Sequence, residues 1–219
     1  MSTSQIKLYN EALRLCGERN LTSLTEARES RRLLDQVWDN DGVRACLEAG
    51  QWKFAMRSIE ITYNPSIEPD FGYTRAFDKP TDLVRTCAVC SDEYFSQPLL
   101  RYNDEAGYWF SDLDTIYVRY VSDDSAYGGD YSLWPATFTK FVAAYFAAEI
   151  VTKLTSDEQK MKSILHPSNG LLAMRRTDAL SKDAMQDPTR FMPEGTWAAA
   201  RRGRWGGSRD GGNRGSLIG

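Results

Sequence analysis

The segment from Ser132 to Leu154 constrains the fold most, because it is too apolar to lie on a surface. It reads SLWPATFTKFVAAYFAAEIVTKL, and its central stretch VAAYFAAEIV places apolar side chains on nearly every side of a helix. Pro135 suits the first turn of such a helix, where its nitrogen is not needed as a hydrogen-bond donor. A helix without a polar face has to be covered on all sides. The segment therefore predicts a central helix in a bundle.

Apolar periodicity predicts two helices before this segment. Residues 4–18 place apolar side chains along one face of a helix. Ser23 and Glu26 match a capping box, in which each side chain accepts a hydrogen bond from an unpaired backbone N–H at the helix start. The sequence therefore predicts a second helix from Ser23 to about Glu48, with Gly42 as a candidate kink.

After the central helix, the chain predicts one interrupted helix. Ser156 and Gln159 repeat the capping-box pattern, and helical periodicity extends to about Met185. The run from His166 to Gly170, with a proline in second place, breaks the helix. His166 is therefore interpreted as a capping or surface group at this break, and not as a catalytic base.

Between these helical segments, residues 52–131 change to the pattern of strands. Runs rich in β-branched and aromatic residues alternate with turn sequences. The strand-like runs are FAMRSIEITY, LVRTCAVC, EYFSQPLLRY, GYWFS and TIYVRYV. We therefore expect a mainly α fold. Its helical bundle, residues 1–51 and 132–186, is interrupted by a small antiparallel β insertion at 52–131, and an extended arm follows at 187–219.

The end of the arm, residues 201–219, has a composition that does not support a core of its own. It reads RRGRWGGSRDGGNRGSLIG, with seven glycines, five arginines and one acid. Glycine loses the most freedom on ordering, so we expect the arm to order only on a partner. Residues 201–219 carry five basic groups against one acid, or +4, whereas residues 1–200 carry 22 against 29, or −7. From residue 187 the chain can extend about 100 Å at ~3.3 Å per residue.

The arm supplies the predicted partner-binding residues. Tryptophans would act as buried anchors, and arginines would pair with acidic groups of the partner. These residues are Trp197, Arg201, Arg202, Arg204, Trp205, Arg209 and Arg214. Two other interpretations stay open, namely an unbound tail and a nucleic-acid-binding segment whose arginines neutralise phosphates.

The four cysteines are interpreted as packing residues. Cys16 and Cys46 lie on apolar helical segments, where a thiol behaves as a small hydrophobe. Cys87 and Cys90 form C-A-V-C in a predicted strand, where positions three apart point to opposite faces, unlike the helix start of a redox motif. Zinc needs two further ligands nearby, and the single histidine is far along the chain. We expect no metal and no cofactor.

Acidic residues gather in the predicted turns, at Asp112, Asp114, Asp123, Asp124 and Asp130. Carboxylates in turns ordinarily accept hydrogen bonds from the backbone or face water, and the spacing of a calcium-binding loop is absent. The chain also lacks the G-x-S-x-G, H-E-x-x-H and phosphate-loop patterns. We therefore expect no enzymatic activity and rank an enzyme third among the functional hypotheses.

Two further features concern surfaces. The aromatic run Tyr108-Trp109-Phe110 has two interpretations of equal weight, as a docking surface or as the core of the small sheet. No run of ~18 apolar residues exists, so we expect no membrane span. The N-terminus carries charges and no uninterrupted apolar stretch, unlike a signal peptide.

Four segments in consistent order, with a fifth near the N-terminus, carry a family resemblance. The segments are Trp52–Ala55 (W-x-F-A), Tyr73–Arg85 (Y-x-x-x-x-x-x-P-x-D-x-x-R), Ile116–Val121 (an R-Y strand), Trp134–Thr155 (a helix that begins with W-P) and Gly17–Leu24. Together they resemble the tail tubular protein A-like adaptors of tailed bacteriophages, over roughly residues 5–185. The break at His166–Gly170 and the Arg/Gly arm depart from the family pattern.

The resemblance implies a structural virion protein at the head-to-tail junction, made in the bacterial host cytoplasm. Its copies would form a twelve-fold ring below the portal protein, with the tail nozzle or the next tail component beneath. The C-terminal arm would contact the portal or a neighbouring subunit, and DNA would pass through the ring without a membrane being involved. The alternative function is a nucleic-acid-associated protein that binds DNA through the Arg/Gly arm.

Overall fold

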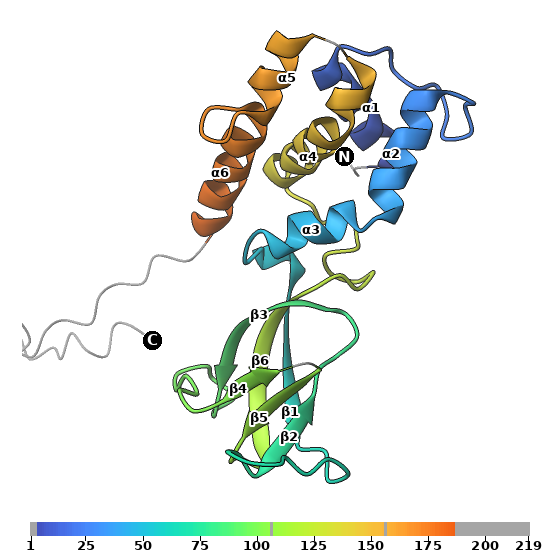
Figure 1. Cartoon of the computed structure of the whole chain (residues 1–219). Coiled ribbons are helices and arrows are strands. Elements are labelled where there is room, and N and C mark those ends of the chain that lie inside the picture. Colours follow the sequence, from blue (N-terminus) through green and yellow to red (C-terminus); the bar gives the residue numbers. More distant parts are fainter. Residues whose placement is uncertain (1–3, 106, 156, 187–219) are drawn as a thin grey trace, which may run out of the picture. The chain divides into compact units, whose positions relative to one another are not determined.

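Helices form the two ends of the described chain, and strands form its middle (Figure 1). The computed structural model describes residues 4–105, 107–155 and 157–186, which belong to the compact unit Met1–Gln186. Every predicted partner-binding residue of the arm, from Trp197 to Arg214, lies outside the described residues.

The central helix is confirmed as α4, Ala136–Leu154. It packs against α1 (Gln5–Cys16) and α6 (Leu171–Ala184), and Figure 1 shows it between them. Buried side chains such as Phe138, Val142 and Phe146 lie on several sides of α4, as its all-apolar sequence predicts. Pro135 is the N-cap of α4, one position before the predicted first turn.

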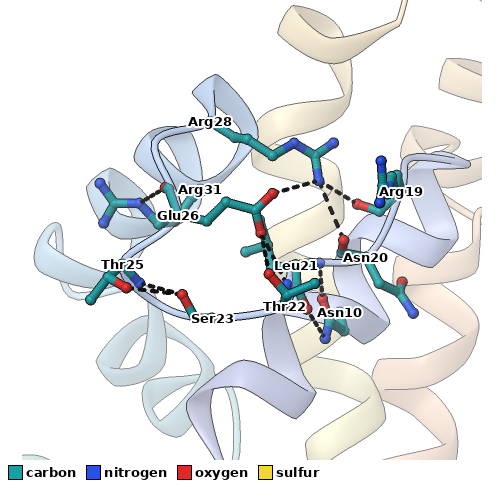
Figure 2. A network of polar contacts seen from close by, with 10 residues as sticks. All are labelled: Asn10, Arg19, Asn20, Leu21, Thr22, Ser23, Thr25, Glu26, Arg28 and Arg31. Atoms are coloured by element: carbon teal, nitrogen blue, oxygen red, sulfur yellow. Dashed lines mark hydrogen bonds and ion pairs between the residues drawn. The ribbon is translucent and has the colours of Figure 1, made fainter.

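The predicted single helix from Ser23 to Glu48 is wrong, because residues 19–28 form a loop. The helical part is divided into α2 (Glu29–Asp39) and α3 (Gly42–Glu48). The Glu26 carboxylate accepts hydrogen bonds from the backbone N–H and the hydroxyl of Thr22, at 3.0 and 3.1 Å, so it closes a turn instead of capping a helix (Figure 2). The side chains of Arg28 and Arg31 then donate to backbone carbonyls of the same loop.

The break between α2 and α3 lies beside Gly42, the glycine predicted as a kink. Asp41 has a left-handed backbone, with φ of 58°, which Asp tolerates better than most residues. A Cβ on Gly42 would lie 2.6 Å from the Val37 carbonyl oxygen, so only glycine permits this close approach.

The interruption predicted at His166–Gly170 is confirmed, between α5 (Glu158–Leu165) and α6. The His166 Nδ1 accepts hydrogen bonds from the N–H groups of Ser168 and Asn169, at 3.3 and 3.1 Å, which confirms its capping role. At the start of α5 the capping carboxylate belongs to Asp157, which accepts from Gln159 and Lys160 N–H groups. The sequence placed this cap one residue earlier, at Ser156, which lies outside the described residues.

The middle of the chain forms two three-stranded antiparallel sheets, with strand orders β1-β6-β3 and β2-β5-β4. The strands are β1 (Met56–Thr62), β2 (Arg75–Asp78), β3 (Leu83–Cys90), β4 (Asn103–Glu105), β5 (Tyr108–Ser111) and β6 (Thr115–Ser122). A separate hydrophobic cluster holds them together, formed by Phe77, Val89, Trp109, Ile116, Val118 and Tyr120. A short 3-10 helix, Lys53–Ala55, leads into β1.

The strand predicted from EYFSQPLLRY is wrong. The Asp92 carboxylate accepts hydrogen bonds from the N–H groups of Ser96 and Gln97, at 3.0 and 2.8 Å, so this segment folds as a loop. The short strands β2 and β4 were not predicted, because neither RAFD nor NDE alternates apolar and polar residues over a useful length.

The expected fold class, mainly α, is also wrong. Helix accounts for 41% and strand for 19% of the described residues, in six helices and two sheets, so the fold is mixed α/β. The expectation underestimated the strands because it treated residues 52–131 as a minor insertion, whereas they bury a hydrophobic cluster of their own. The domain boundaries at 51, 131 and 186 stay predictions.

Candidate interaction sites

The first candidate site is the junction between the helices and the sheets, where aromatic residues from distant segments meet. The Trp52 and Phe54 rings each lie 4.8 Å from the Phe138 ring. The Trp134 ring lies 5.0 Å from Phe138, and its indole N–H donates to the Gly128 carbonyl at 2.8 Å. Two of the segments quoted for the family resemblance, W-x-F-A and the start of the W-P helix, therefore contact each other.

A polar network is centred on Asp82, and Gly128 links it to the aromatic group by donating its N–H to the Ser122 carbonyl at 3.1 Å. The Asp82 carboxylate accepts hydrogen bonds from the Tyr120 hydroxyl at 3.1 Å, the Ser122 hydroxyl at 2.5 Å and the Arg57 guanidinium at 3.0 Å. Asp82 comes from the P-x-D-x-x-R segment, and Tyr120 from the R-Y strand. The network thus joins two more of the five quoted segments, and the fifth, Gly17–Leu24, takes no part in it.

The pKa values of Asp82 and Tyr120 are shifted in the directions expected for a carboxylate that accepts a hydrogen bond from a phenol. Burial by itself raises the pKa of Asp82, but the hydrogen bonds from Ser122, Arg57 and Tyr120 outweigh burial, so the pKa falls below its usual value. Burial, helped by the hydrogen bond donated to Asp82, raises the pKa of Tyr120 to about 12. The carboxylate therefore stays ionised and the phenol stays neutral around neutral pH.

Arginines connect the helices to the strands. The Arg44 side chain of α3 forms an ion pair with Asp123 and donates to the Leu83 carbonyl at 2.7 Å. Arg85 of β3 donates back to the Glu48 carbonyl at 3.2 Å. Val121, at the end of β6, belongs to the same hydrophobic cluster as the helices. The junction is therefore apolar at its centre and bonded by charge at its edge.

Two of the cavities formed by the described residues lie on the helical side. The larger, about 330 Å³, is an open groove lined mainly by apolar residues of α3, α4 and α6, including Ala45, Phe141 and Leu172. The smaller, about 190 Å³, lies between α2, α3 and the segment after β6. Its lining consists of Trp38, Asp41, Val43, Arg44, Leu47, Asp123, Gly129 and Tyr131. The sequence predicted neither cavity, because the residues that line each cavity come from segments far apart in the chain.

The strand region presents exposed apolar side chains on an acidic surface. Phe71, Tyr94 and Leu100 are 88%, 81% and 89% exposed. Residues 52–131 hold 7 basic against 14 acidic side chains, a net charge of −7. Of the aromatic run, Trp109 is fully buried, which confirms the core interpretation for that residue, whereas Tyr108 and Phe110 are half-buried. The three exposed apolar side chains therefore lie in loops of a negatively charged region, Phe71 between β1 and β2, and Tyr94 and Leu100 between β3 and β4.

Most of the cysteines and turn carboxylates considered as reactive groups are buried or hydrogen-bonded to the backbone in the described residues. Burial raises the pKa of the Cys16 thiol to about 11 and raises that of Cys46 further, so neither is poised as a thiolate. The carboxylates of Asp112, Asp124 and Asp130 accept hydrogen bonds from backbone N–H groups, as turn acids do. Within residues 4–105, 107–155 and 157–186, no three His, Cys, Asp or Glu side chains are placed to hold a metal ion.

Comparison with known proteins does not assign a function to these sites. No family model matches the chain, and no curated protein matches it. A membrane crossing is likewise not indicated, since none of the helices in the described part of the chain is both long and apolar enough for one. The functional argument therefore rests on the contacts above and on the sequence segments that form them.

Proposed function

We propose that this chain is a structural virion protein, a head-to-tail adaptor whose copies form a ring between the portal and the tail. One observation carries the proposal. Four of the five segments that resemble the adaptor family, far apart in the sequence, contact one another in pairs, two at Phe138 and two at Asp82. Residues that recur because they hold an architecture together should be those that contact one another in the fold. The proposal gives the chain no catalytic step.

The distribution of charge supports a role in assembly. The helical residues, 1–51 and 132–186, hold 14 basic against 13 acidic side chains, whereas the strand residues carry −7 and residues 201–219 carry +4. Opposite charges on two parts of one chain favour contacts between copies, since they attract at short range. In the proposal, the strand region faces the next tail component, and the arm contacts the portal or a neighbouring subunit.

Mass photometry of the chain mixed with portal rings of the same phage tests the proposal. The full-length protein should add a fixed number of copies to each portal, and a 1–186 truncation should not. Both hydrophobic clusters lie between Leu8 and Ala179, so the truncation removes none of their residues. If neither protein adds to the portal, the adaptor proposal is wrong.

The Arg/Gly composition of residues 201–219 favours DNA binding as the second candidate function. A DNA titration over a range of salt concentrations separates the two. Binding through phosphate neutralisation would weaken steeply as salt rises, with a slope set by the number of phosphates contacted. Tight DNA binding by the full-length protein, together with no portal binding, would select this alternative.

A further inference from the structure

The smaller cavity, beside the break between α2 and α3, combines carboxylates with aromatic rings. Asp41 and Asp123 contribute acids, and Trp38 and Tyr131 contribute rings whose centroids lie 5.5 Å apart. Its volume of about 190 Å³ corresponds to roughly six water molecules at ~30 Å³ each, which suits a single long side chain. The structural role of the junction does not require an open pocket of this composition.

The lining of the smaller cavity holds two carboxylates and one guanidinium, so one negative charge is not balanced. The Arg44 guanidinium is engaged by the Asp123 carboxylate and by the Leu83 carbonyl. The Asp41 carboxylate makes no capping hydrogen bond to α3 and lies exposed to solvent. Two carboxylates against one guanidinium give the lining a net charge of −1, so a cationic ligand is favoured over a neutral or anionic one.

The aromatic residues favour a guanidinium over an ammonium ion. A planar guanidinium stacks on a ring and donates in-plane hydrogen bonds to a carboxylate at the same time, whereas an ammonium ion is compact and strongly hydrated. The chain already places guanidinium groups over aromatic rings elsewhere. The Arg75 guanidinium lies 4.0 Å from the Tyr63 ring centroid, and that of Arg119 lies 4.2 Å from the Phe95 ring.

From these contacts we infer that the cavity between Trp38, Asp41 and Tyr131 is a binding site for an arginine side chain, supplied by the C-terminal arm of a second copy of the chain. The arm is rich in arginine, with five arginines and one acid in residues 201–219. It also has the reach, since the 33 residues from Asp187 to Gly219 can span about 100 Å at ~3.3 Å per residue. The choice of a second copy rests on the proposed function, in which copies lie side by side.

A labelled peptide of residues 199–219, titrated with the 1–186 protein at low salt, tests the site by fluorescence anisotropy. Asp41→Asn should weaken binding about three- to fivefold, because it removes a charge-assisted hydrogen bond at a solvent-exposed carboxylate. Asparagine also tolerates the left-handed backbone at this position, so the fold is kept. Asp39→Asn removes an exposed charge on α2 that is absent from the lining, and should change binding less than about twofold.

A second peptide separates the chemistry of the ligand from its charge. Replacing all five arginines by lysine keeps the net charge of +4, yet binding should weaken several-fold, since lysine cannot stack and pair simultaneously. Tyr131→Leu should weaken the arginine peptide and leave the lysine peptide nearly unchanged.

Three results would overturn the inference. They are an absence of peptide binding, equal binding by Asp41→Asn and Asp39→Asn, and equal binding of the arginine and lysine peptides. The portal experiment keeps the two proposals apart. If the peptide fails but the full-length chain adds to the portal, the pocket is wrong and the adaptor proposal stands. If the peptide binds through Asp41 while the portal is not bound, the pocket stands and the adaptor proposal falls.

Discussion

The helical and the strand regions of this chain are stabilised differently. The helices share one large apolar cluster centred on α4, and their surface charges nearly balance, with 14 basic against 13 acidic side chains. The strands bury a much smaller cluster, carry −7, and expose Phe71, Tyr94 and Leu100. Burial of apolar area dominates stability, so the helical region should carry most of the folding free energy. In the proposed function, the strand region faces the next tail component.

The largest effect should come from the aromatic centre of the junction. Phe138→Ala removes a ring that contacts Trp52, Phe54 and Trp134, and we expect a loss of about 3–5 kcal/mol in the free energy of unfolding. Urea denaturation measures it. Leu133→Ala, at a residue 47% exposed, is the control and should change stability by less than about 1 kcal/mol. Similar losses for both variants would contradict the comparison.

Asp82→Asn should have the next largest effect. It weakens three hydrogen bonds to a carboxylate whose side chain is only 14% exposed, and we expect about 2 kcal/mol of destabilisation. Because the network ties the residue before β3 to β1 and β6, and Arg44 of α3 bonds to the next residue, Leu83, the variant should lower the stability of both regions together. Loss of strand signal at a lower urea concentration than helix signal would show that the regions unfold independently.

The same residue predicts a dependence on pH. The pKa of Asp82 is lower in the folded than in the unfolded chain, so its contribution is complete above the unfolded value of about 3.9 and is lost as pH falls through the folded value. We expect Asp82→Asn to lose less stability than the wild type on acidification from about pH 5 to pH 2. Thermal unfolding over this range measures the difference, and identical acid limbs would rule out the assignment.

A smaller effect is expected at the start of α5. The Asp157 carboxylate caps the helix by accepting from the N–H groups of Gln159 and Lys160, and Asp157→Ala should cost about 1 kcal/mol. Asp178→Ala, at an exposed position within α6, removes the same charge without a cap and serves as the control. Equal effects of the two substitutions in urea denaturation would show that the cap contributes little.

The smallest effect on stability is expected at the most exposed aromatic residue of the strand region. Phe71 is 88% exposed, so Phe71→Ser should alter the free energy of unfolding by less than about 0.5 kcal/mol. A larger loss would mean that the strand region depends on this residue for folding. Unchanged stability together with weaker attachment of the next tail component would instead support a division in which the helices stabilise the fold and the strand region contacts the partner.

The helices were easier to predict from the sequence than the strands. The stretch VAAYFAAEIV predicts α4 because its composition alone requires burial, and the proline after His166 predicts the interruption before α6. The start of α2 was missed because the Ser23 and Glu26 pattern closes a turn when Thr22 competes for the carboxylate. The strands β2 and β4 are too short to show a period.

The sites were predictable only in part. The P-x-D-x-x-R segment pointed to Asp82, but its partners Arg57 and Ser122 lie 25 residues before and 40 residues after it, on strands whose register no local pattern fixes. The cavity beside Asp41 gave no sequence signal, because it forms only when α2, α3 and the segment after β6 come together. The predicted arm residues lie outside the described chain, so their role stays a prediction.

Electron microscopy of portal rings mixed with the full-length chain would test the central claim most directly. The account predicts a closed ring of added density, coaxial with the portal and absent when the 1–186 truncation is used. Added density that is off-axis, present as isolated copies, or missing altogether would contradict the adaptor proposal.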